Sequence, residues 1–98
     1  MKEPARIDAY VIETLLPDLV GHDRQPSAFL VYLYLTYHGP RGRPVDVSLQ
    51  MIATDTGLSK SAVQRSLRTL ARRRLIRTDR ASRTAVPRHV VLRPWIRR

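Results

Sequence analysis

The stretch from Ser48 to Leu70 constrains the fold of this chain more than any other, because it predicts two helices joined by a very short turn. Ser48 and Ser59 each precede an amphipathic segment, where a serine can cap a helix by accepting a hydrogen bond from a backbone N–H. Gly57 lies between the two segments, at a position where a helix often ends with a positive φ. This spacing is that of a helix-turn-helix unit, whose second helix can enter a DNA major groove.

The second helix of this unit is expected to have one buried face and one basic face. Val63, Leu67 and Leu70 recur at helical spacing and predict the buried face. The next residues in the sequence, 71–77, contain four arginines. Leu75 and Ile76 in this segment are expected to complete the core at the end of the helix. A short helix pair that continues into such a basic run favours a polyanionic partner.

The charge of the chain is segregated along its length. Residues 1–40 carry a net charge of −2, whereas residues 41–98 carry +12, which gives the total of +10. Sixteen of the eighteen cations are arginine, whose planar fork suits phosphate and guanine edges. The basic half is therefore also the half that contains the predicted helix pair.

Composition narrows the class of protein further. A chain of 98 residues with 43% hydrophobic residues is expected to form one domain with a single modest core. It has no cysteine for disulfides or metal binding, no membrane-spanning run and no signal-peptide pattern, so the expected location is the cytoplasm. The expected parts are an N-terminal helical or extended segment, residues 1–24, and a DNA-binding domain, residues 25–98.

The first half of the chain predicts a buried helix that begins at Pro26 and stops near Gly39. This helix is apolar nearly all round, which requires cover on two sides, either from residues 1–24 or from a second subunit. We favour a homodimer, whose interface would contain Val31, Tyr32 and Leu35. Residues 1–24 fit a helix that Pro17 would end or bend, although a strand over residues 10–13 is the alternative.

The remaining sequence predicts a small amount of β-structure. Residues 45–47 are long enough for one short edge strand. A hairpin is expected after the helix pair, with a first strand from Leu75, a polar loop over residues 79–84 and a return strand over residues 88–92. The expected fold class is therefore mainly α with a small β-hairpin.

This order of elements resembles the winged helix-turn-helix fold. The residues from Ser27 to Leu92 resemble the DNA-binding domains of bacterial GntR-like and MarR-like regulators, and also helix-turn-helix modules of phage and plasmid replication proteins. The match is strongest over residues 59–70 and the following Leu-Ile-Arg. Arg74 stands where these families usually have glycine, which leaves the turn into the wing open.

The candidate site residues follow from a helix that lies in the major groove. Its outward residues would read bases, and by resemblance the first three match positions that usually do so: Lys60, Ser61, Gln64, Arg65 and Arg68. Phosphate contacts are expected from the helix start and exit: Ser59, Arg72, Arg73 and Arg77. The loop of the wing would add a third group: Arg80, Ser82 and Arg83.

The three histidines have no metal-ligand spacing, and no phosphate loop or nucleophile–base set is present, so we expect no enzyme, metal or cofactor. The expected function is sequence-specific binding of double-stranded DNA, as a bacterial transcriptional regulator without a small-molecule effector domain or membrane contact. A replication or partition factor, a protein-interaction winged helix and an RNA-binding protein are the alternatives.

Overall fold

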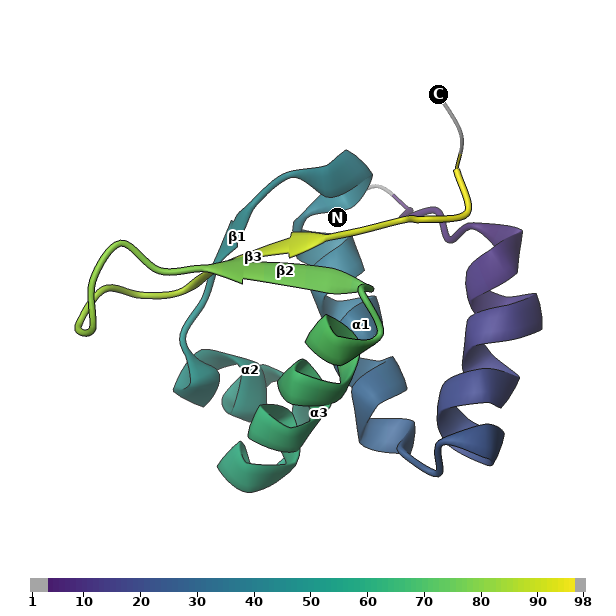
Figure 1. The fold of residues 1–98 in the computed structure, drawn as a ribbon, viewed down its shortest axis with the longest axis horizontal. Helices are drawn as coiled ribbons and strands as arrows, with labels where there is room; N and C mark the ends of the chain where they lie inside the picture. The colour runs from purple at the N-terminus through teal and green to yellow at the C-terminus, as the bar shows by residue number, and fades with distance from the viewer. Residues whose placement is uncertain (1–3, 97–98) are drawn as a thin grey trace.

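The computed structural model describes residues 4–96, in which helices pack beneath and beside one small antiparallel sheet (Figure 1). The chain begins with two π-helical segments, η1 (Val11–Leu15) and η2 (Pro17–His22), which follow one another directly and form what we call the N-terminal helix. Pro17 does not end this helix as expected. It stands where η1 gives way to η2, inside the continuous helical run.

Helix α1 (Pro26–His38) has the predicted boundaries and lies at the centre of the molecule. The N-terminal helix packs on one side of it and α3 (Lys60–Arg72) on another. As a result Val31, Tyr32 and Leu35 are at most 1% exposed within a single copy of the chain. The predicted dimer interface on these three residues is therefore wrong, because several elements of the same chain, the N-terminal helix among them, pack around α1.

The helix pair forms as predicted from the sequence. A 3-10 turn, η3 (Pro40–Gly42), and a short strand, β1 (Val45–Asp46), lead from α1 into α2 (Leu49–Thr56) and α3 (Lys60–Arg72). The hydroxyl oxygen of Ser48 accepts a hydrogen bond from the N–H of Met51 at 3.0 Å, and that of Ser59 accepts one from Ala62 at 3.1 Å. Gly57 ends α2 with a φ of 79°. Both caps and the glycine turn are thus confirmed.

Strands β2 (Ile76–Asp79) and β3 (Arg88–Val91) form the predicted hairpin, and β1 pairs with the other side of β3. All pairs are antiparallel, with Ile76 opposite Val91 and Thr78 opposite His89. The chain turns from α3 into β2 through Arg74, which has a φ of 58°. The turn that glycine usually makes is therefore kept, at a cost of about 1–2 kcal/mol for a residue with a Cβ.

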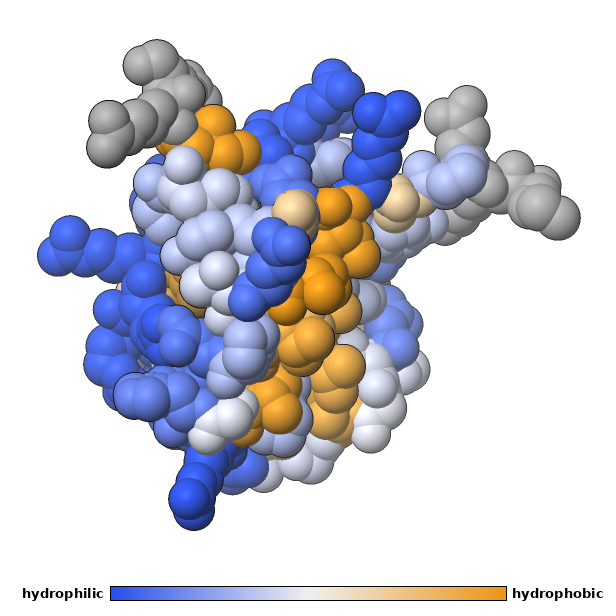
Figure 2. Space-filling model, turned by 90° about the vertical axis from the view of Figure 1, so that its right-hand side faces the viewer, coloured by the Kyte–Doolittle hydropathy of each residue, from blue (hydrophilic) through white to orange (hydrophobic). Residues whose placement is uncertain are grey.

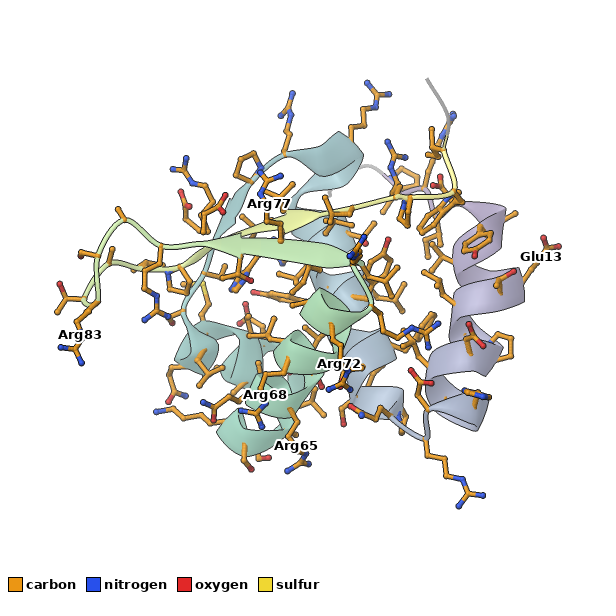
Figure 3. The ribbon with its side chains drawn as sticks, viewed as in Figure 1. Glu13, Arg65, Arg68, Arg72, Arg77 and Arg83 are labelled. Atoms are coloured by element: carbon orange, nitrogen blue, oxygen red, sulfur yellow. The ribbon has the colours of Figure 1, made fainter. Side chains whose placement is uncertain are left out.

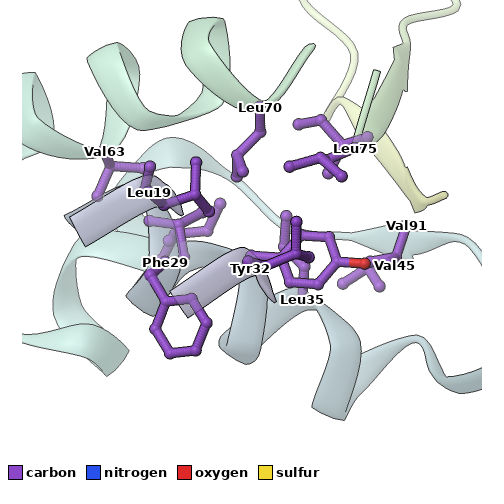
Figure 4. Packing of buried hydrophobic residues seen from close by; sticks show 14 of the residues in the cluster. Leu19, Phe29, Tyr32, Leu35, Val45, Val63, Leu70, Leu75 and Val91 are labelled. Carbon is purple, nitrogen blue, oxygen red and sulfur yellow. The ribbon is translucent and has the colours of Figure 1, made fainter. Parts of the chain in front are cut away.

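One buried cluster joins all of these elements (Figure 4). Leu19 from the N-terminal helix, Leu35 from α1, Val63 and Leu70 from α3 and Val91 from β3 all belong to it. The hydroxyl of Tyr32 crosses the cluster and donates to the carbonyl oxygen of Leu92 at 3.0 Å. Helices packed beneath a three-stranded sheet, with a hairpin projecting beside the second helix of the pair, make this a winged helix-turn-helix fold.

Candidate nucleic-acid interface

Helix α3 divides into a buried face and an exposed polar face. The buried face carries five side chains, all at most 9% exposed: Ala62, Val63, Ser66, Thr69 and Leu70. Leu67, expected in the core, is half-buried at its edge. All five predicted base-reading residues are exposed: Lys60, Ser61, Gln64, Arg65 and Arg68. Figure 3 shows Arg65, Arg68 and Arg72 in sequence along this helix.

The cations on this face are not neutralised by the protein. Lys60, Arg65, Arg68 and Arg72 are exposed, and none forms an ion pair with a carboxylate of residues 4–96. Helix α3 contains no acidic residue. The nearest acidic residue of the helix pair, Asp55, accepts a hydrogen bond of 2.6 Å from the hydroxyl of Tyr34. The face therefore presents a row of free positive charges, which suits a polyanion.

A groove of about 640 Å³ separates α3 from the hairpin. Gln64 and Arg68 line it from α3, and Arg80 and Arg83 line it from the loop between β2 and β3. That loop, the wing, projects beyond the helices at the left of Figure 1. Arg80 donates to the carbonyl oxygen of Arg83 at 3.3 Å, and the Ser82 hydroxyl accepts from the N–H of Ala85 at 3.2 Å. Cations thus lie on both walls of the groove.

Ser59, the first predicted phosphate contact, is exposed at the start of α3. Its hydroxyl caps the helix and lies 3.3 Å from the hydroxyl of Ser61. The backbone N–H groups of a helix start and the positive end of the helix dipole both attract anions. The start of α3 is therefore compatible with the predicted contact, next to Lys60.

The structure corrects the predicted phosphate contact of Arg73. Its guanidinium donates to the carboxylates of Asp23 at 2.5 Å and Asp18 at 2.9 Å, both from the N-terminal helix and its end. Hydrogen bonds from His22 and Arg73 hold the pKa of Asp23 below its ordinary value. Because both carboxylates bind its guanidinium, Arg73 anchors the N-terminal helix to the end of α3. No local pattern in the sequence predicts these two ion pairs, because the aspartates lie 50 and 55 residues from Arg73.

The predicted phosphate contact of Arg77 is also corrected. Side chains alternate between the two faces of a strand. Ile76 and Val91 belong to the buried cluster, and Thr78 and His89 line the groove beside α3, so these two pairs face the helices. Arg77 therefore lies on the opposite face of the sheet, away from α3, where it forms an exposed 3.3 Å ion pair with Asp79. The labelled side chain in Figure 3 lies on this outer side.

His89 lines the groove and was not identified from the sequence. It is 2% exposed, its Nδ1 lies 2.9 Å from the hydroxyl oxygen of Thr78, and its Nε2 is buried without a hydrogen-bond partner among residues 4–96. Burial lowers the pKa of His89, and the positive charge of Arg80 lowers it further. The neutral imidazole is therefore the form that supports the base of the wing. A histidine on a predicted strand gives no signal of such burial.

Lowering the pH from about 8 to about 5.5 should reduce the free energy of unfolding through His89. The unfolded chain binds a proton near the ordinary pKa of 6.5, whereas folded His89 resists it, so stability falls as the pH drops below 6.5 toward the lowered pKa. Urea titrations across this range should show the slope in the unmodified chain and lose much of it in His89→Gln. The exposed His38→Gln is the control, and an equal slope in all three proteins would contradict the prediction.

Within residues 4–96 no group of three or more histidine or acidic residues is placed to hold a metal ion. Likewise, no helix in the described part of the chain has the length and apolar composition needed to cross a membrane.

Comparison with known proteins places this geometry in a family. No curated protein and no solved structure matches the chain. The family described as "Helix-turn-helix domain" matches residues 25–76, which run from the residue before α1 to the first residue of β2. This match covers more than half of the 98 residues and includes both helices of the pair with the cap and the turn between them. The chain therefore belongs to the helix-turn-helix domain family and carries a DNA-binding module of that type.

Proposed function

We propose that this protein binds double-stranded DNA in a sequence-specific manner and acts as a bacterial transcriptional regulator. Helix α3 would lie in the major groove, where Gln64 can pair with an adenine edge and Lys60 or Arg65 with guanine. Arg72 would contact phosphate at the exit of the helix, and Arg80 and Arg83 of the wing would contact the neighbouring backbone or minor groove. The proposed action is binding without a catalytic step.

The observation that carries this proposal is the exposed face of α3. Five polar or cationic side chains project from it, and its cations have no carboxylate partner in residues 4–96. Unpaired like charges repel one another in the free protein and attract a polyanion. A DNA phosphate backbone neutralises all of them at once.

Regulation of transcription is the role that a binding surface of this kind can perform by occupying a site, in the bacterial cytoplasm where the DNA lies. Binding as a homodimer is part of the proposal, because two copies of α3 would read two half-sites and so double the sequence information. Selection of bound sequences from random duplex DNA would define the half-site and show whether it is repeated. An absence of binding to random duplex at low salt would favour a protein-interaction role instead.

Replacing Gln64 with alanine should separate base reading from phosphate contact. Gln64→Ala removes a bidentate base partner, so we expect a loss of about 1–3 kcal/mol at the selected site and a weaker preference at one or two base pairs. Arg72→Ala removes a phosphate contact and should weaken binding to selected and shuffled duplexes about equally. Fluorescence anisotropy titrations of each variant on both duplexes provide the measurement.

The control for these titrations is Arg73→Ala. Because the guanidinium of Arg73 is held by Asp18 and Asp23, its removal should change stability more than sequence preference. If Gln64→Ala weakened both duplexes equally while Arg72→Ala changed the preference, the orientation of α3 in the groove would be the reverse of the one proposed.

A further inference from the structure

The exposed face of α3 has two long edges, and the wing borders only one of them. Gln64 and Arg68 form the edge that lines the groove beside the wing. Arg65 and Arg72 form the other edge, because residues seven apart on a helix lie on one line. Figure 3 shows both of these side chains farther from the wing than Arg68. The second edge is therefore open to a part of a partner that the wing does not reach.

The turn between the N-terminal helix and α1, residues 23–25, is attached to this second edge. Thr69 lies four residues after Arg65 and three before Arg72, so it is a direct neighbour of both on the helix. Its hydroxyl donates a hydrogen bond of 2.7 Å to the side-chain oxygen of Gln25. The backbone N–H of Gln25 donates to a carbonyl oxygen of the N-terminal helix, also at 2.7 Å. The turn is therefore held beside the second edge of α3.

Arg24 is the cation that this turn carries. Asp23 before it accepts a hydrogen bond from Arg73, and Gln25 after it accepts one from Thr69, so the backbone on both sides of Arg24 is held against α3. The Arg24 side chain is exposed. Its φ of 54° is one that residues with a Cβ rarely adopt. The turn thus fixes the backbone of Arg24 and leaves its guanidinium exposed beside α3.

Three exposed arginines beside this turn have no carboxylate partner within residues 4–96, and we call them the cationic edge: Arg24, Arg65 and Arg72. The neighbouring carboxylates of Asp18 and Asp23 are already bound by Arg73. These four arginines and two aspartates together carry a net charge of +2. Like charges on one edge repel one another, and a phosphate backbone removes this repulsion.

The outer surface of the N-terminal helix is unsuited to phosphate. Figure 2 faces this helix and shows an apolar stripe with hydrophilic residues gathered to one side of it. Ile12 and Val20 of the helix are 46% and 37% exposed and cannot bind an anion, and the exposed Glu13 would repel one. Beside the N-terminal helix, a phosphate is therefore favoured at the cationic edge.

We propose that Arg24 contacts the DNA backbone on the side of α3 opposite the wing. The major groove is bordered by two phosphate backbones, and a helix that lies in it has one on each side. The wing follows one of them, and Arg24 binds a phosphate of the other, as Arg72 does. Asp23 and Gln25 act as positioning residues, because they hold the turn that presents Arg24. This inference rests on the proposed function and adds to it a second backbone contact, made by the segment that precedes α1.

Arg24→Gly tests this contact without straining the backbone, because glycine adopts a positive φ without a steric penalty. Affinity for the selected and the shuffled duplex should fall by about the same factor, roughly 10-fold, since a phosphate contact carries no sequence information. The magnitude of the salt slope should decrease by about 1 relative to the unmodified chain. Fluorescence anisotropy titrations measure both quantities.

Arg41→Gly is the matched control. Arg41 is also an exposed arginine with a positive φ, 59°, but it lies in η3, which packs against α1 and β3. The two variants lose the same charge from the same backbone conformation, and only Arg24→Gly should change DNA binding. Arg24→Gln removes the charge and keeps a polar side chain. It should weaken binding as Arg24→Gly does, which keeps the test valid if the glycine variant is destabilised.

Duplexes that carry one neutral methylphosphonate at a time map the position of the contact. One phosphate should lose its effect on affinity in Arg24→Gly, and it should lie across the major groove from the phosphates that lose theirs in Arg83→Ala. If Arg24→Gly bound DNA as tightly as Arg41→Gly, or if its phosphate lay on the side of the wing, this inference alone would be overturned. A failure of the unmodified chain to bind any duplex at low salt would overturn the proposed function, and this inference with it.

Discussion

Raising the salt concentration from 50 to 200 mM should weaken binding of one copy of the protein to duplex DNA about 1000-fold. Six exposed cations border the groove or α3 without a carboxylate partner in residues 4–96: Lys60, Arg65, Arg68, Arg72, Arg80 and Arg83. A cation that enters the duplex interface displaces condensed counterions, whether it contacts a phosphate or a base edge in the groove, so six cations give a slope of about −5 in a plot of log affinity against log salt. Arg73 and Arg77 do not contribute, because their guanidinium groups pair with aspartates.

Two variants make this prediction specific to the proposed face. Arg72→Ala should reduce the magnitude of the slope by about 1, because it removes one proposed phosphate contact. Arg43→Ala removes an exposed cation next to η3, which packs against α1 and β3, and should leave the slope unchanged. A flat salt response, or a slope that Arg43→Ala changes as much as Arg72→Ala does, would contradict the assignment of the interface to α3 and the wing.

Leu19→Ala should lower the free energy of unfolding by about 2–5 kcal/mol. The Leu19 side chain is 0% exposed and packs in the same cluster as α1 and α3, so its truncation loses apolar burial and leaves a cavity. A loss of this size would show that the N-terminal helix is part of the folding unit rather than an appendage. Urea denaturation followed by circular dichroism at constant protein concentration measures the change.

Met51→Ala provides the control for this loss. Met51 is 48% exposed on α2, so its truncation should change stability by no more than about 0.5 kcal/mol. If Leu19→Ala were as mild as Met51→Ala, the N-terminal helix would not be docked on α1 in solution, and the buried cluster described above would be wrong.

The features that could be predicted from the sequence are those that nearby residues determine. The caps at Ser48 and Ser59, the glycine at 57 and the spacing of Val63 and Leu70 each act within a few residues, so the helix pair and its exposed face followed from them. The separation of charge pointed to the same half of the chain. Arg74 shows the limit of the family pattern, because arginine adopts the φ of 58° that glycine usually supplies.

The features that could not be predicted depend on which distant segments meet. An apolar helix such as α1 needs cover on two sides, but its sequence does not say whether the cover comes from the same chain or from another. The role of Arg73 depends on two aspartates that lie 50 and 55 residues away. In the sequence, Arg73 is the middle one of three consecutive arginines, and nothing distinguishes it from the other two. Its neighbour Arg72 is exposed and unpaired within residues 4–96.

The two faces of α3 have a consequence for how such proteins diversify. The side chains that hold α3 in the fold point inward, and those at positions 60, 61, 64, 65 and 68 point outward and bury little. Under the proposed function, a descendant of this chain can therefore exchange its outward residues, and with them its preferred DNA sequence, without first acquiring a compensating change in the core. Duplicated copies can acquire separate targets by drift at five positions, while the same scaffold is inherited unchanged.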